Sequence, residues 1–183
     1  MTKPQRVYLA GPEVFFPELE HRRIVASKKR LLAAYGLEGV DPLDTQLEAT
    51  GSESPQALGF RIYRANRELM ESCQAIIANL SPFRGLSADP GTVFEVGYMI
   101  AQGKSAIGYT MDPRNYYERA GSTPTDKLGH TVENFGLSDN LMIECGIVEA
   151  GGEIVRGHGS SNEPFFDEAV FERCVRALTK RHA

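Results

Sequence analysis

Apolar and polar positions change their spacing along the chain in a regular order, and this order predicts strands and helices in turn. Short runs rich in apolar and β-branched residues are typical of strands. They span residues 6–10, 37–40, 74–80 and 104–110. Longer segments have the length and the apolar content or spacing of helices. They span residues 18–35, 55–72, 90–103 and 163–180.

The alternation of these elements predicts the fold class. A strand precedes each of the first three helices, and such β-α-β units form parallel sheets through right-handed crossovers. We therefore expect one α/β domain, with a doubly wound parallel sheet of about five strands and helices on both faces. Residues 140–150 are predicted to form either the last strand or a short helix. Residues 111–139 form a long irregular segment, which in a compact domain is usually functional or part of an interface.

The same periodicity predicts which helical residues face the core. The inward positions of the first helix are Leu19, Ile24, Val25, Leu31 and Leu32. Those of the second helix are Ile62, Ala65, Leu69 and Met70. Those of the last helix are Phe166, Val170, Phe171, Val175 and Leu178.

Length, composition and charge exclude several classes of protein. The chain has 183 residues, which is enough for one full hydrophobic core. Its net charge is −4 and Lys and Arg form no stripe, so nucleic acid is not an expected partner. No apolar run reaches the roughly 18 residues of a membrane span, and residues 1–6 lead into a strand without a signal peptide. We therefore expect a cytoplasmic protein.

Cysteine and histidine usage predicts neither a disulfide framework nor a metal site. Cys73, Cys145 and Cys174 are far apart and form no CxxC pair, so reduced structural thiols are expected. The four histidines are scattered without the spacing of metal ligands.

Glu95 is the first candidate for chemistry. Its helix has an N-cap residue in Asp89, a proline at the first helical position and a stop signal in Gly103. Glu95 is the only charged residue inside this helix, and no Lys or Arg lies three or four residues away. A carboxylate in an apolar setting is unfavourable unless it is hydrogen-bonded or functional. The alternative is an exposed glutamate on the solvent edge of the helix.

Asp89 is the second acidic candidate. Six residues separate it from Glu95, which corresponds to about 240° around a helix, so the two do not share a face. They converge only if Asp89 turns in from the preceding loop, as a non-helical cap can. The alternative is that Asp89 is a plain N-cap.

Further candidates follow the strands, because ligands of doubly wound sheets bind beyond the carboxyl ends of the strands. Segments 11–16 and 81–89 fall there, and neither contains GxGxxG or GxxxxGK[ST], so a dinucleotide or P-loop site is not expected. Phe15 and Phe16 offer aromatic faces to a flat heterocycle, or else pack in the ordinary way. Tyr8, on the first strand, is placed to hydrogen-bond a carboxylate, or else is a packing residue.

Three blocks of sequence resemble the nucleoside 2-deoxyribosyltransferase family. They are Tyr8-Leu-Ala-Gly-Pro12, the long block from Ile77 to Gly97, and Phe135-Gly-Leu-Ser-Asp-Asn-Leu-Met142. The resemblance covers residues 6–150. It implies a flavodoxin-like fold and the transfer of 2-deoxyribose between nucleobases without a cofactor. It further implies 2'-deoxynucleosides and free nucleobases as substrates, and a homo-oligomer with shared active sites.

The resemblance also implies roles for individual residues. Glu95 matches the family's nucleophile, which forms a covalent deoxyribosyl ester that an incoming base resolves, as in retaining glycosidases. Asp89 matches the carboxylate that binds the sugar hydroxyl or handles the proton of the base, and Tyr8 matches the residue that orients the nucleophile. The implied substrate-binding residues are Gly11, Phe15, Gln46, Asn66 and Asn140, with Asn140 lent by a neighbouring subunit.

Asn66 is a departure from the family pattern, which usually has an aspartate at this position. An amide hydrogen-bonds a base edge but does not deliver a proton as a carboxylic acid does. A general acid is worth roughly 10²–10⁴ in rate, so this exchange bears on base specificity or efficiency. The alternative is that Asn66 is a surface residue of its helix.

Two other functions compete with base exchange. One is a nucleoside or nucleotide N-glycosidase that uses the same glutamate and water; Arg84 is the nearest candidate for binding a 5'-phosphate. The other is a nucleotide-sensing module without turnover, which only Asn66 favours. The presence of Glu95, Asp89 and Tyr8 together argues against a pure binder.

Overall fold

The computed structural model describes residues 5–45, 53–158 and 164–180. Its centre is a five-stranded sheet in the order β2-β1-β3-β4-β5, in which every neighbouring pair is parallel. The strands are β1 (Arg6–Ala10), β2 (Glu38–Val40), β3 (Ala75–Asn79), β4 (Ser105–Thr110) and β5 (Ile154–Arg156). This is the flavodoxin-like, doubly wound order, and the predicted fold class is confirmed.

The helices begin where the sequence provides local signals. They are α1 (Glu18–Ala34), α2 (Pro55–Glu71), α3 (Pro90–Ala101), α4 (Tyr116–Arg119), α5 (Leu141–Glu149) and α6 (Glu168–Lys180), with short 3-10 helices η1 (Pro12–Phe15) and η2 (Pro42–Asp44). The side chain of Ser54 caps α2, where Pro55 takes the first position. Asp89 and Pro90 begin α3 in the same way.

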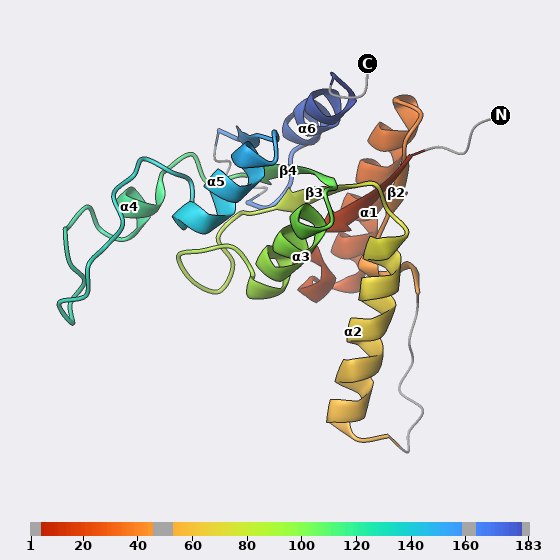
Figure 1. Cartoon of the computed structure of the whole chain (residues 1–183), viewed down its shortest axis with the longest axis horizontal. Helices are drawn as coiled ribbons and strands as arrows, with labels where there is room; N and C mark the ends of the chain where they lie inside the picture. Colours follow the sequence, from red (N-terminus) through yellow and green to blue (C-terminus); the bar gives the residue numbers. More distant parts are fainter. Residues whose placement is uncertain (1–4, 46–52, 159–163, 181–183) are drawn as a thin grey trace.

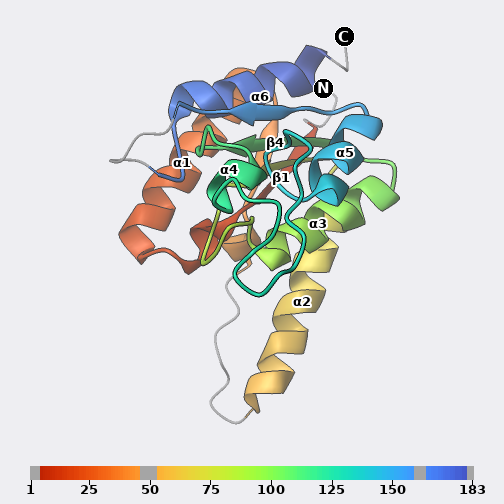
Figure 2. The same ribbon diagram turned by 90° about the vertical axis from the view of Figure 1, so that its left-hand side faces the viewer.

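The helices cover both faces of the sheet (Figures 1 and 2). α1 and α6 pack together on one face, over a core that includes Val7 and Leu9 of β1. α3 and α5 pack on the other face, where the core includes Tyr8 and Ala10. Successive residues of a strand point to opposite faces. β1 therefore serves both cores and directs Tyr8 toward the α3 side.

The C-terminal third differs from the prediction in its details. The segment 140–150 is the helical alternative, α5, and the last strand, β5, comes from a stretch without a predicted element. β5 has three residues, which is too short for an alternating pattern to be recognised. α6 begins at Glu168, later than predicted, and residues 159–163 lie outside the described part of the chain.

The predicted inward face of α2 is wrong for most of its members. Only Met70 is fully buried, Ala65 and Leu69 are half-buried, and Ile62 is 41% exposed. Figure 1 shows the reason, because the N-terminal half of α2 projects away from the sheet, beyond the part of the helix that lies beside α3. Leu19 of α1, also predicted inward, is 83% exposed.

The strand order places the expected ligand site between β1 and β3. The chain runs from β1 to α1 on one face and from β3 to α3 on the other, so the two connections diverge at the topological switch point. Segments 11–16 and 81–89 leave the sheet there and contact each other through Phe15 and Phe83. Among the described residues, no helix is long and apolar enough to cross a membrane.

Candidate active site

Tyr8 and Glu95 meet on the α3 face of the sheet. The Tyr8 hydroxyl donates a hydrogen bond of 2.7 Å to Oε1 of Glu95. Tyr8 is fully buried, and Glu95 is half-buried rather than exposed. The pairing joins residues that are 87 positions apart in the sequence. The structure thus brings together the predicted nucleophile and its predicted orienting residue, although their roles stay predictions.

The surroundings of Glu95 favour its neutral form. Burial raises the pKa of Glu95 to about 7, the charge of Asp89 adds to this effect, and the hydrogen bond from Tyr8 opposes it. Burial, and next the charge of Glu95, raise the pKa of Tyr8 far above its usual value. Tyr8 therefore remains a hydrogen-bond donor at any physiological pH. A carboxyl group that titrates near neutrality beside a fixed donor is typical of a catalytic position.

Asp89 is a helix cap and also lies close enough to influence Glu95. Its Oδ2 accepts hydrogen bonds from the backbone N–H of Thr92 at 3.0 Å and from the Thr92 hydroxyl at 3.3 Å. Asp89 is buried, and its charge contributes to the raised pKa of Glu95. The two interpretations of Asp89 are therefore compatible, because the carboxylate that caps α3 is also close enough for its charge to raise the pKa of Glu95.

An aromatic surface borders the carboxyl ends of β1 and β3. The rings of Phe15 and Phe83 are stacked, with centroids 5.6 Å apart and planes 9° apart. The guanidinium of Arg84 lies 4.8 Å from the Phe15 ring centre and 4.7 Å from that of Phe83. Phe15 is 51% exposed, so part of its ring remains open to a planar ligand. Phe16 instead packs edge-on against Phe165 and contacts the core.

Of the other predicted substrate-binding residues, those that the structure describes form no hydrogen bond with Tyr8 or Glu95. Gly11 is buried against the carboxylate of Glu13. Asn66 is half-buried on α2. Asn140 caps α5, and its side-chain amide donates a 2.6 Å hydrogen bond to Glu133 of its own chain. Gln46 lies outside the described residues.

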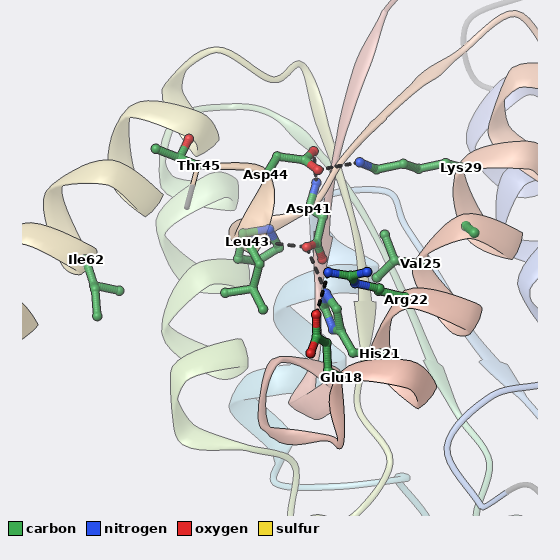
Figure 3. Close-up of a pocket in the computed structure, with 12 residues that line it drawn as sticks. Glu18, His21, Arg22, Val25, Lys29, Asp41, Leu43, Asp44, Thr45 and Ile62 are labelled. Carbon is green, nitrogen blue, oxygen red and sulfur yellow. Dashed lines mark hydrogen bonds and ion pairs between the residues drawn. The ribbon is translucent and has the colours of Figure 1, made fainter. Parts of the chain in front are cut away.

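A surface pocket of about 660 Å³ lies between α1, η2 and the exposed Ile62 of α2 (Figure 3). Its charged groups are already matched within the chain. Lys29 pairs with Asp44 at 2.5 Å, and His21 bridges Asp41 at 3.1 Å and a backbone carbonyl. Neither Tyr8 nor Glu95 lines it. We place the candidate site at Glu95 because the carboxyl with the raised pKa, its hydrogen bond from Tyr8 and the aromatic surface are there.

Several buried polar residues near the site were missed by the sequence reading. Glu13, Lys28, Asn79 and Tyr109 form one hydrogen-bonded cluster under the loops that follow β1 and β3. One signal was available, since Lys28 falls on the same helical face as the apolar residues of α1 and a charged residue at such a position is unusual. Among the described residues, no group of three or more potential ligands could hold a metal ion.

Comparisons with known proteins identify the family and the fold. The sequence model described as nucleoside 2-deoxyribosyltransferase matches residues 7–142. An uncharacterized protein of Schizosaccharomyces pombe, C191.05c, is 40% identical over 181 residues, covering 87% of this chain and 84% of that protein. The 2-desoxiribosyltransferase of Leishmania mexicana superposes with a TM-score of 0.69 at 30% identity, covering 94% of this chain and 98% of that chain. The 2-deoxyribosyltransferase of Bacillus psychrosaccharolyticus shares the fold, with a TM-score of 0.50 at 19% identity over 91% of this chain and 95% of its own.

Proposed function

Because the chain belongs to the nucleoside 2-deoxyribosyltransferase family, we propose that it exchanges the bases of 2'-deoxynucleosides through a covalent deoxyribosyl-glutamate. The observation that carries this proposal is the half-buried Glu95 carboxyl, held at 2.7 Å by the Tyr8 hydroxyl and titrating near neutrality. The expected compartment is the cytoplasm, where such exchange serves nucleoside salvage.

The reaction is a double displacement. In the first step, an oxygen of Glu95 bonds to C1' of the sugar, and the bond from C1' to the base nitrogen breaks. The departing base takes up a proton, for which Asp89 or water is the donor. In the second step, the nitrogen of an incoming base bonds to C1', loses its proton and releases Glu95. Two inversions retain the configuration at C1', as in retaining glycosidases. Tyr8 holds the carboxylate in line, and neither step requires a cofactor.

The proposal is tested by incubating the protein with deoxyinosine, with and without adenine. Formation of deoxyadenosine supports base exchange. Release of hypoxanthine at the same rate without adenine indicates a hydrolase instead. Binding of deoxyinosine without any product indicates a sensor and overturns the proposal.

One observation keeps hydrolysis of nucleotides as a second candidate function. Arg84 is exposed beside the aromatic surface, and it has no ion pair with any described residue. A guanidinium in this position suits a 5'-phosphate. Cleavage of deoxyinosine 5'-monophosphate that is faster than cleavage of deoxyinosine, and that is lost in Arg84→Ala, would favour this candidate.

The raised pKa of Glu95 also predicts that both activity and stability depend on pH. The nucleophile must be ionised, and its pKa is about 7, so we expect the exchange rate to rise up to about this pH and then level off. Between the ordinary pKa of 4.5 and the value of about 7, the folded protein holds a proton that the unfolded chain has lost. The unfolding free energy should therefore fall as pH rises across this range.

Glu95→Gln separates these effects, because glutamine imitates the protonated carboxyl. Its stabilisation relative to the wild type should grow between pH 5 and pH 8, as measured by urea unfolding. The exposed Glu149→Gln is the matched control. A wild-type rate that does not change with pH, together with a constant stability difference, would contradict a titrating nucleophile at position 95.

We further propose that the protein is a homo-oligomer. α2 and α3 expose an aromatic face composed of Phe60, Tyr63, Phe94 and Tyr98, in which Phe60 is 63% and Phe94 53% exposed. A projecting helix with exposed aromatic rings is typical of an interface rather than of a free surface. Phe94 precedes Glu95, so a second copy bound to this face would lie next to the nucleophile. Such a copy is expected to supply Asn140.

Asn66→Asp is expected to raise the rate of exchange or to change the preferred base. The structure gives the Asn66 amide no hydrogen-bond partner among the described residues, so its side chain is available to a ligand. A carboxylic acid there restores the proton donor of the family pattern, an effect of up to roughly 10²–10⁴ in rate. The measurement is kcat with purine and pyrimidine donors, with Asn66→Ala as the control. An unchanged profile would place Asn66 outside the site.

A further inference from the structure

One buried carboxylate, that of Glu13, joins three structural elements, α1, β3 and β4. Its Oε1 accepts hydrogen bonds from Lys28 of α1 at 2.7 Å, from the Asn79 amide at the end of β3 at 2.8 Å and from the Tyr109 hydroxyl of β4 at 3.1 Å. Glu13 itself lies in η1, directly after β1. Glu13 is 4% and Lys28 2% exposed, and the other two are fully buried. We call these four residues the Glu13 cluster.

The charge of Lys28 is enclosed by aromatic rings. Its ammonium nitrogen lies 5.5 Å from the ring centre of Tyr109, 5.9 Å from that of Phe166 and 5.6 Å from that of Phe171. Burial, and next the charge of Glu13, raise the pKa of Tyr109, so this hydroxyl remains a donor to Glu13. A buried ion pair is often no more stable than apolar residues of the same shape. We therefore attribute to the Glu13–Lys28 pair a role in positioning the chain rather than in stabilising it.

The cluster continues into the loops that follow β3 and β4. Oδ1 of Asn79 accepts hydrogen bonds from the Ser81 backbone N–H at 3.1 Å and from the Ser81 hydroxyl at 2.7 Å. The Ser81 hydroxyl oxygen in turn accepts a hydrogen bond of 3.0 Å from the backbone N–H of Met111. One continuous chain of hydrogen bonds thus holds the three segments that leave β1, β3 and β4 at the carboxyl edge.

Gly11 links this chain to the backbone. A side chain at Gly11 would place its Cβ 1.9 Å from Oε2 of Glu13 and 2.9 Å from Cβ of Asn79. The Glu13 carboxylate therefore folds back against the backbone just after β1, and its position and that of η1 are coupled. Phe15, at the end of η1, contacts Phe83 of the neighbouring loop. The Glu13 cluster thus adjoins the segments that carry both rings of the aromatic surface, η1 through Glu13 and the loop after β3 through the Asn79–Ser81 hydrogen bonds.

We propose that Glu13 and Lys28 are positioning residues that set the affinity for the nucleobase by fixing Phe15 against Phe83. This inference rests on the proposed base exchange. Lys28 and Tyr109 belong to the α1 and α6 side of the sheet, whereas Tyr8 belongs to the α3 side. Loosening the cluster should therefore weaken binding of the acceptor base more than it slows attack by Glu95. When less acceptor base is bound, a larger share of the deoxyribosyl intermediate reacts with water instead of with base.

The test compares Glu13→Gln, Lys28→Met and the double variant, with a saturating deoxyinosine donor and adenine varied. We expect Glu13→Gln to raise KM for adenine about tenfold, the equivalent of roughly one hydrogen bond, with kcat within about threefold of the wild type. The ratio of hydrolysis to transfer at fixed adenine should rise by a similar factor. Lys28→Met leaves a buried carboxylate without its counter-charge and should lower Tm strongly.

The double variant separates positioning from stability. It carries no unpaired charge, so its Tm should return close to the wild-type value, while KM for adenine stays raised. If KM returns together with Tm, the pair is only structural and the inference is wrong. The exposed pair Arg30–Glu168, 2.7 Å apart, gives the matched control in Arg30→Met and Glu168→Gln, which should change neither KM nor the ratio.

Failure of the inference is distinguishable from failure of the proposed function. A wild-type protein that makes no deoxyadenosine overturns both. Wild-type exchange with unaltered KM for adenine in Glu13→Gln and in the double variant overturns only the positioning role.

Discussion

Replacing Glu95 by alanine is expected to lower the rate of base exchange by at least about 10³-fold, because the covalent route is lost. Glu95 receives the Tyr8 hydrogen bond and has the perturbed pKa. Steady-state formation of deoxyadenosine from deoxyinosine and adenine measures the effect. Glu95→Gln should be equally inactive, because an amide keeps the shape but is not a nucleophile. Circular dichroism would verify that both variants are folded.

The covalent intermediate provides an independent test of the same residue. A 2-fluorinated deoxyribosyl donor slows both displacements, so the ester should accumulate. Mass spectrometry of peptides should then find the adduct on Glu95 and on no other residue, and the Glu95→Ala protein should remain unlabelled. Near-normal exchange in Glu95→Ala, or an adduct at another position, would show that the nucleophile is elsewhere.

Charges on the aromatic face of α2 are expected to separate the subunits. Phe60→Asp combined with Tyr63→Asp places two carboxylates among the exposed rings while leaving α3 unchanged. Loss of two aromatic interface residues at about 2 kcal/mol each weakens association by roughly 10³-fold. Analytical ultracentrifugation should show smaller species, and activity should fall on dilution far sooner than in the wild type. Glu68→Lys, an exposed position on another side of α2, is the control.

Mixing experiments test whether the sites are shared. Asn140 caps its own helix and contacts Glu133, so Asn140→Ala alone does not separate a structural role from a lent residue. If the site is shared, mixtures of inactive Glu95→Ala and Asn140→Ala subunits should regain part of the activity through mixed oligomers. If the Phe60→Asp/Tyr63→Asp protein remains associated, the proposed interface is wrong. If the mixtures recover no activity, the active sites are not shared.

Much of the fold was predictable because its signals are local. The nearly continuous apolar run of β3 is typical of a parallel strand buried on both faces, and the residues of β3 are all buried. Asp89 and Pro90 predicted the start of α3, because an N-cap residue is followed by a residue suited to the first turn. The alternation of such elements restricts the topology, since parallel connections are right-handed. β5 was not predicted, because a strand of three residues is too short to show an alternating pattern.

The sequence alone determined the order of strands and helices from β1 to β4, and it identified Tyr8, Asp89 and Glu95 as candidates, because caps, periodicity and residue type act over a few positions. Tertiary structure alone decided which side chains meet. Tyr8 reaches Glu95 across 87 positions and Glu13 reaches Tyr109 across 96, and no local pattern encodes such pairs. Burial, which raises the pKa of Glu95 and leaves the inward-patterned Ile62 exposed, depends on how the elements pack and is therefore a property of the folded chain.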